Sequence, residues 1–404
     1  MSFAVKLMKE DANICVFISN VCNASFNSAV FPSILKTASI TPVIKNYESE
    51  DDSPSNYRPI SNLKTISKLL EKVVVTRLIT HLEKVNYLHP YQSAYRSKHS
   101  TETATLLVTN SWRAALDRGK IVCVASLDVT AAFDTVNHDI LLSRLSQAGV
   151  IGRALKWFKS YLTARTATVS FNGAHSNPFS LHSGVPQGST LGPYLFNCYM
   201  ADLARVLERI DGVNFHIYAD DVLISVECYP QDLSDATEKL QRAILRTETW
   251  MKNNCLLLNM RKTELFILHG QRTILPDNIP SILIGDLSLD FCIHGSFRWL
   301  GVNFDVSLTM NEFVNNTCRL CFMQLRMLRR IRKRLNKQST KLLCHALVLS
   351  RKDYCLTLLA SCPQTLLYKL QRVINLGARI IEGSKMFDNI TPLLKDLKWL
   401  SIRK

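Results

Sequence analysis

The residues best placed to do chemistry in this chain are two adjacent acids, Asp220 and Asp221. They follow an apolar run, 213–217, and precede another, 222–226, a pattern that predicts a strand, a tight turn and a second strand. Two carboxylates so close repel, and each raises the pKa of the other. A divalent metal ion is the simplest group that would hold them together, although solvated turns also carry adjacent acids.

A third acid, Asp128, ends the apolar run 121–127, which predicts a strand buried on both faces. If this strand lies beside the hairpin in one sheet, the three carboxylates could hold two hard cations of the magnesium type. Paired metals on carboxylates are the chemistry of nucleotidyl transfer. The alternative interpretation makes Asp128 the cap of a helix and the paired acids ordinary turn residues.

The charge of the chain indicates a polyanionic partner, because 49 basic residues exceed 33 acidic ones and the formal net charge is +16. No acid occurs between Glu312 and Asp353. Apolar residues interleave there with basic ones at helical spacing, which predicts a basic amphipathic helix whose charged side faces phosphates. A solvated face, a nuclear-import segment and a membrane-surface helix are the alternatives. The basic residues expected to contact nucleic acid are Arg326, Arg329, Arg330, Lys333 and Arg334.

The cysteines predict a reduced, intracellular chain, because the 12 of them are scattered without a disulfide-like spacing. Cys318 and Cys321 form a Cys-x-x-Cys pair, but no second pair follows at zinc-site spacing, so core positions are expected for both. No apolar run approaches the roughly 20 residues that a membrane span requires.

The order of the motifs resembles that of a reverse transcriptase. The pattern Tyr218-Ala219-Asp220-Asp221 is similar to the third palm motif of that family, and the Asp128 segment is similar to the first. Further segments resemble the other palm motifs, the fingers and the thumb of LINE-type (non-LTR) retrotransposon enzymes, in particular the jockey-like branch. These segments are 183–193, 258–264, 298–302, 56–61, 92–102, 349–355 and 390–394.

The resemblance implies a right-hand polymerase of class α+β, with fingers, an antiparallel-sheet palm and a helical thumb. Its expected parts are an incomplete lead-in at 1–35, fingers and palm at 36–310, the thumb at 311–382 and a post-thumb segment at 383–404. The lead-in is too short for the endonuclease that usually precedes the fingers. We therefore expect a truncated copy, without that domain, that keeps the polymerase centre.

The implied activity is RNA-directed DNA polymerisation by two-metal nucleotidyl transfer onto a DNA 3′-hydroxyl. By resemblance, Asp128 and Asp220 bridge two Mg²⁺ ions, with Mn²⁺ as the alternative ion. Asp221 lies beside the primer terminus, and the carbonyl of Val129 completes the coordination. The implied partners are an RNA template, a DNA primer and deoxynucleoside triphosphates, and no membrane is among them. The family relationship also implies that the protein acts in the nucleus.

Further roles follow from the same resemblance. Gln187 would contact the nucleotide sugar or the template base, Arg96 would bind the triphosphate in two places at once, and Lys262 would protonate pyrophosphate. Ordinary surface positions are the alternative for Arg96 and Lys262. The primer grip would be Trp299, Leu300 and Gly301.

Two other functions compete with the leading one. An RNA-dependent RNA polymerase more often carries Gly before the paired acids, and it must select for a 2′-hydroxyl, so Ala219 and Phe133 argue against it. A catalytically silent, transposon-derived RNA-binding protein would keep the basic thumb over an inert palm.

Phe133 provides a test of the resemblance, because an aromatic residue five positions after the first acid packs under the incoming sugar and excludes a 2′-hydroxyl in this family. We expect Phe133→Ala to incorporate ribonucleotides, measured as the ratio of ribonucleotide to deoxynucleotide insertion in primer extension. An unchanged ratio would instead assign Phe133 to the hydrophobic core, where most Phe residues lie.

Overall fold

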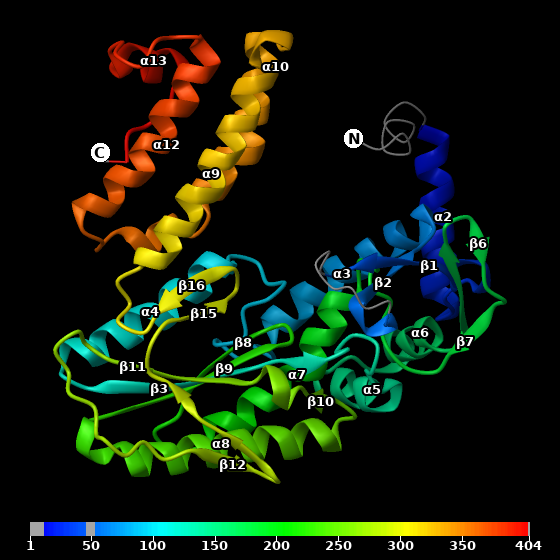
Figure 1. The fold of residues 1–404 in the computed structure, drawn as a ribbon. Helices are drawn as coiled ribbons and strands as arrows, with labels where there is room; N and C mark the ends of the chain where they lie inside the picture. The colour runs from blue at the N-terminus through cyan, green and yellow to red at the C-terminus, as the bar shows by residue number, and fades with distance from the viewer. Residues whose placement is uncertain (1–11, 46–52, 403–404) are drawn as a thin grey trace. The chain divides into compact units, whose positions relative to one another are not determined.

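The computed structural model describes residues 12–45 and 53–402, and the chain divides into two compact units. The first comprises Met1–Ser97, Leu127–Leu223 and Arg242–Thr263, and the second comprises the remaining segments. Residues 1–11 of the expected lead-in lie outside the described ranges. Both units combine helices with sheets, which confirms the α+β class (Figure 1).

The first unit contains a sheet in the order β2-β1-β5-β6, with β7 also paired to β5. Strand β1 is antiparallel to β2 and parallel to β5. The elements of this unit are α2 (Ala12–Ser28), β1 (Thr37–Ile44), β2 (Tyr57–Asn62), α3 (Thr65–Lys84), β4 (Val129–Thr130), α5 (His138–Gln147), α6 (Gly152–Leu162), β5 (Arg165–Phe171), β6 (Ala174–His175), β7 (Phe179–Leu181), α7 (Gly192–Glu208), β8 (Asn214–Tyr218) and β10 (Leu257–Leu258).

Helix α7 forms much of the core of the first unit, since 11 of its 17 residues are buried. Pro193 lies in its first turn, and the Ser189 hydroxyl accepts a hydrogen bond from the backbone N–H of Gly192 (2.8 Å). Asn172 and Gly173 form the turn of a hairpin, because Phe171 of β5 pairs with Ala174 of β6.

The turn before α7 passes very close to the end of β2. The backbone N–H of Ser61 donates to the carbonyl of Gln187 (2.6 Å), and Gly188 has a φ of +124°. A Cβ atom at Gly188 would lie 2.4 Å from the carbonyl oxygen of Ser61. Only glycine fits this position, both for its backbone conformation and for its space.

The second unit contains strands in the order β14-β11-β3-β9. Strand β3 is buried over nearly its whole length, as predicted, and pairs antiparallel with β11, Ser126 opposite Glu264. The elements are α4 (Thr101–Asp117), β3 (Ile121–Leu127), β9 (Asp221–Cys228), α8 (Leu233–Asn253), β11 (Glu264–Leu268), β12 (Ile282–Ile284), β13 (Leu287–Leu289), β14 (Phe291–Cys292), β15 (Ser296–Trp299), β16 (Val302–Asp305), α9 (Asn311–Ile331), α10 (Lys337–Cys344), α11 (Ser350–Asp353), α12 (Gln364–Glu382) and α13 (Ile390–Leu397). Strands β3 and β9 and helix α8 each pass from one unit into the other.

The helical end of the second unit differs from the single basic helix that the sequence predicts. Helix α9 ends at Ile331 and packs beside α12, and a 3-10 turn, Arg332–Arg334, separates it from α10 (Figure 1). The Arg332 guanidinium lies in this turn and donates to the carbonyls of Ile380 and Ile381 in the last turn of α12 (2.9 Å each). Within the described ranges, none of the helices has the length and apolar character to cross a bilayer.

The close approach at Gly188 predicts a large loss of stability for Gly188→Ala. The backbone must adopt a conformation that L-residues avoid and must also move away from Ser61, so we expect unfolding to become easier by about 2–4 kcal/mol. The control is Gly173→Ala, at φ +83° with nothing within 4 Å of its Cβ, which should lose only about 1 kcal/mol. Equal losses in urea denaturation would contradict the steric argument.

Candidate active site

The hairpin that carries the paired acids is formed as the sequence predicts. Strand β8 ends at Tyr218, β9 begins at Asp221, and the turn between them places Ala219 in the left-handed region, at φ 56°. Ala219 is only 6% exposed, so the tip is packed rather than loose. A left-handed non-glycine residue costs about 1 kcal/mol, which the surrounding packing must offset.

Asp128 is fixed by the segment that contains Lys262. Its backbone carbonyl accepts a hydrogen bond from the N–H of Asn259 (2.8 Å), and Val129 pairs with Leu258 where β4 meets β10. The ammonium of Lys262 lies 3.5 Å from Oδ2 of Asp128. The Asp128 segment and the 258–264 segment are therefore joined through their backbones as well as by an ion pair.

The three acids lie close enough to influence one another. Burial, and after it the charges of Asp220 and Asp128, raise the pKa of Asp221 to about 7. Burial also raises the pKa of Asp220, as does the charge of Asp128, while a backbone hydrogen bond and the Arg58 charge lower it. Partly desolvated carboxylates whose charges repel form a site that favours a cation.

The donor set suits magnesium. Three carboxylates and a backbone carbonyl are the hard oxygen ligands that Mg²⁺ prefers, and raised acid pKa values are expected wherever such ligands lack their cation. Among the described residues, no group of three or more His, Cys, Asp or Glu side chains is gathered tightly enough to hold a metal by itself. Mg²⁺ is usually bound by one or two carboxylates together with substrate phosphates, which fits this more open arrangement.

Phe133 precedes Asp134 in the chain, and Gln187 is hydrogen-bonded to Asp134. The ring of Phe133 is half-buried and stacks on Phe196 of α7, with centroids 4.6 Å apart. The side-chain amide of Gln187 donates to Oδ2 of Asp134 (2.7 Å). Burial raises the pKa of Asp134, while the Gln187 hydrogen bond and the charge of Lys45 lower it. The stacking on Phe196 thus gives Phe133 a packing contact that a role in sugar selection would not need.

Arg96 binds its own loop. Its Nη1 donates to the carbonyls of His89 (2.7 Å) and Gln92 (2.8 Å), and the side chain lines a cavity of about 140 Å³ together with Tyr95 and Tyr194. Burial lowers the pKa of Arg96, and the charge of Glu83 raises it. These contacts give Arg96 a structural role in the loop, beside the phosphate role expected for it.

Two residues near the acids had no role in the sequence analysis. Arg58 is exposed on β2, and its charge lowers the pKa of Asp220. The pKa of Tyr95 is raised by burial and then by Asp220. Arg58 belongs to the 56–61 segment that the resemblance already covers, so the motif itself was the signal that could have identified it.

The expected primer-grip residues form the tip of the β15–β16 hairpin in the second unit. Trp299 is buried, and Leu300 and Gly301 both have positive φ, 47° and 80°. The hydroxyl of Tyr354 donates to the carbonyl of Leu300, and two of its ring carbons lie 3.4 and 3.6 Å from where a Cβ of Gly301 would be. The hairpin tip is therefore held by a residue that follows α11.

The expected nucleic-acid contacts on α9 and the turn after it are exposed. Arg326, Arg329, Arg330, Lys333 and Arg334 all face solvent. Leu325, Leu328 and Cys321 are buried, but Met323, Met327 and Ile331 are 48%, 55% and 46% exposed. The apolar side of α9 is thus packed only in part.

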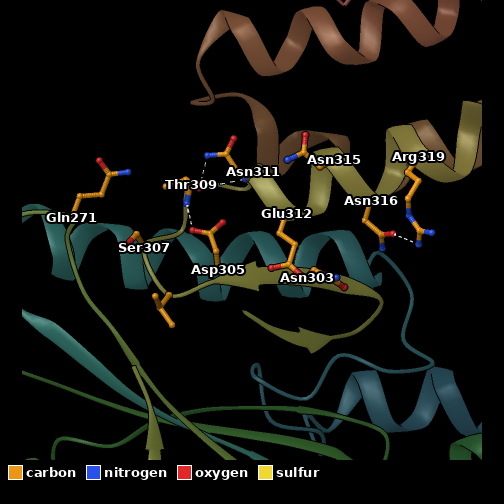
Figure 2. Close-up of a pocket in the computed structure, with 11 residues that line it drawn as sticks. Gln271, Asn303, Asp305, Ser307, Thr309, Asn311, Glu312, Asn315, Asn316 and Arg319 are labelled. Carbon is orange, nitrogen blue, oxygen red and sulfur yellow. Dashed lines mark hydrogen bonds between the residues drawn. The ribbon is translucent and has the colours of Figure 1, made fainter. Parts of the chain in front are cut away.

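A polar groove of about 730 Å³ lies at the start of α9 (Figure 2). Amide side chains dominate its lining, and Asp305 accepts a hydrogen bond from the backbone N–H of Thr309 (2.8 Å). The side-chain amide oxygen of Asn315 accepts a hydrogen bond from the ammonium of Lys369 of α12 (2.7 Å). Several of its amide side chains are already hydrogen-bonded within the unit.

Comparisons with known proteins agree on one family. A family model described as "Reverse transcriptase (RNA-dependent DNA polymerase)" matches residues 44–304. The chain is 31% identical to the "Probable RNA-directed DNA polymerase from transposon BS" of Drosophila melanogaster, over 80% of this chain and 35% of that protein. It is 27% identical to the "RNA-directed DNA polymerase from mobile element jockey" of the same organism, over 74% and 32%. The chain therefore spans about a third of the length of these relatives.

A solved structure supports the fold. The apo telomerase of Candida tropicalis matches with a TM-score of 0.50 at 12% identity, covering 95% of this chain and 64% of that one. At that identity the likeness concerns the fold alone, and it confirms the expected right-hand polymerase architecture.

The raised pKa of Asp221 predicts a pH-dependent stability in metal-free protein. Between about pH 4 and pH 7 the folded state keeps a proton that the unfolded state releases, since the ordinary value is 3.8 and the folded value is about 7. The free energy of unfolding should therefore fall as pH rises through this window, by about 2 kcal/mol after allowance for partial exposure.

We expect Asp221→Asn to remove most of this fall, and Mg²⁺ to oppose it in the wild type. The measurement is urea denaturation at pH 5 and pH 8 with and without Mg²⁺. Asp211→Asn, an exposed acid before β8, is the control and should behave as the wild type. Identical pH dependence in all three proteins would show that Asp221 titrates normally.

Proposed function

Because this chain belongs to the reverse transcriptase family, with relatives among non-LTR retrotransposons, we propose that it is an RNA-directed DNA polymerase. The reaction would join a deoxynucleotide to a DNA 3′-hydroxyl with release of pyrophosphate. The observation that supports it most is the electrostatic coupling of Asp128, Asp220 and Asp221 in one partly desolvated site.

In this proposal, Asp128, Asp220 and the carbonyl of Val129 would hold two Mg²⁺ ions, or Mn²⁺ ions, with Asp221 as the third acid. Bound ions of this type lower the pKa of the attacking hydroxyl and neutralise charge on the leaving oxygens. The chain's own contribution is to hold the acids in place. The hairpin fixes Asp220 and Asp221, and the backbone contact to Asn259 fixes Asp128.

The neighbouring residues would bind the nucleotide. Phe133 would face the sugar while stacked on Phe196, and Gln187 would be oriented by its hydrogen bond to Asp134. Lys262 is exposed beside Asp128 and would protonate pyrophosphate. For the triphosphate, Arg58 is a second candidate beside Arg96, because Arg58 is exposed near Asp220 whereas Arg96 is bound to its own loop.

We further propose fingers and palm at 36–310, a thumb at 311–382 and a post-thumb segment at 383–404. The hairpin tip at 299–301 would support the primer strand. The exposed basic residues of α9 and the turn after it would contact phosphates of the RNA–DNA hybrid, reading its shape more than its sequence. Deoxynucleoside triphosphates complete the set of partners, and the nucleus, where chromosomal DNA lies, would be the place of action.

Primer extension tests this proposal. A DNA primer on an RNA template should be extended in the presence of Mg²⁺ and deoxynucleotides. We expect Asp220→Asn/Asp221→Asn to lose at least about 10³-fold of that rate, because charge neutralisation in the transition state is lost.

The matched control is Asp235→Asn/Glu238→Gln, two exposed acids on α8, which should extend the primer as the wild type does. Equal product from the wild type and the Asp220/Asp221 variant would refute the polymerase assignment. Tight, salt-sensitive RNA binding without any product would favour the silent RNA-binding alternative.

A further inference from the structure

Glu71 is a buried acid in the middle of α3. Its side chain is 0% exposed, yet within the described ranges it has no Lys, Arg or His at ion-pair distance. A buried carboxylate without a counter-ion is strongly destabilising unless hydrogen-bond donors surround it. Its partners must therefore account for its presence in the core.

The donors to Glu71 come mainly from the turn that carries Gln187. Oε2 accepts from the hydroxyl of Ser189 (2.9 Å) and from the backbone N–H groups of Thr190 (2.7 Å) and Leu191 (3.3 Å). Oε1 accepts from the hydroxyl of Ser67, one turn earlier on α3 (2.9 Å). The carboxylate also lies just before the N-terminus of α7, where the helix dipole favours negative charge.

Ser189 extends this contact to a third element. Its only hydroxyl proton is donated to Glu71, so Tyr161 must be the donor in the 2.9 Å contact between the Tyr161 and Ser189 hydroxyls. The guanidinium of Arg165, which is 1% exposed, lies 4.9 Å from the centroid of the Tyr161 ring and donates to the Tyr161 carbonyl (3.0 Å). Helices α3 and α6 thus hold the same serine.

The other side of the turn is held by β2. Ser61 donates to the carbonyl of Gln187, and Gly188 packs directly on the Ser61 carbonyl. Gln187 therefore lies on a short segment fixed by β2 at one end and by Glu71 at the other. A change at Glu71 would shift the backbone that sets the direction of the Gln187 side chain.

We propose that Glu71 is a positioning residue for nucleotide binding, which acts by holding the 186–191 turn and through it Gln187. This inference rests on the proposed function, in which Gln187 contacts the incoming nucleotide. Glu71 does not touch the substrate itself, so its effect should appear in the KM for the deoxynucleotide more than in kcat.

The kinetic test compares Glu71→Ala with Glu71→Gln. Alanine leaves the turn's donors unsatisfied, so KM should rise at least about 10-fold with kcat changed less than about 3-fold. Glutamine keeps an oxygen that can accept from Thr190 and Leu191, so its KM should stay within about 3-fold of the wild type. A fall in kcat with KM unchanged in both variants would overturn the proposal, because it would indicate only fewer folded molecules.

Ser67→Ala is the matched control. It removes a hydrogen bond to the same carboxylate on the side away from the turn, so it should lower the melting temperature while leaving KM within about 2-fold. A KM increase in Ser67→Ala as large as that in Glu71→Ala would contradict the role of the turn. If Glu71→Ala does not fold, Tyr161→Phe replaces it, with a KM increase expected and an unchanged KM counting against the proposal.

Hydrogen–deuterium exchange gives a readout that does not need activity. In Glu71→Ala, or in Tyr161→Phe if that variant replaces it, the backbone amides of Thr190 and Leu191 should exchange at least about 10-fold faster, with the β8–β9 hairpin unchanged. Unaltered exchange in 186–191 would refute the positioning role. If the wild type extends no primer, the proposed function fails, whereas the exchange result still decides whether Glu71 holds the turn.

Discussion

Repulsion among three carboxylates is the constraint that the centre of the first unit must withstand. Asp128 comes from the end of a buried strand, and Asp220 and Asp221 come from a hairpin tip, so only the backbone brings them together. Burial makes the repulsion stronger, since partly desolvated charges are poorly screened. The packed Ala219 turn and the backbone bond to Asp128 are what keep the acids in place.

A second constraint is the close packing around the 186–191 turn. Gly188 allows the backbone to touch Ser61, and Glu71 gathers the free N–H groups ahead of α7. Both contacts are made by residues of β2 and α3, which follow one another in the chain. The acids and the turn are therefore held by different elements of the same unit, the acids by short strands and the turn by a buried carboxylate.

Much of the site was predictable because its signals are local. The hairpin follows from two apolar runs around paired acids, and the start of α7 follows from a Pro-Gln-Gly-Ser turn before an apolar helix with Pro193 in its first turn. Asp128 stands out as an acid at the end of an apolar run. The resemblance then supplied roles for residues such as Phe133 and Gln187, whose contacts with Phe196 and Asp134 no local pattern indicates.

The parts that sequence could not provide depend on contacts between distant residues. Glu71 looks like an ordinary exposed acid on a helix, and its partner Ser189 is 118 residues away. Arg96 has the residue type expected for phosphate binding, but nearby carbonyls occupy its guanidinium. The basic segment was predicted as one helix because nothing local reveals that Arg332 caps the end of α12.

The contact between Tyr354 and Leu300 links the integrity of the β15–β16 tip to sequence that is translated later. A polypeptide ending before Tyr354 would keep all three acids but leave the Leu300 carbonyl and the face of Gly301 open to water. Without the Tyr354 contact, Leu300 and Gly301, which both have positive φ, would interconvert among several loop conformations. A chain without Tyr354 would therefore keep its acidic centre and lose the contact that holds this hairpin tip.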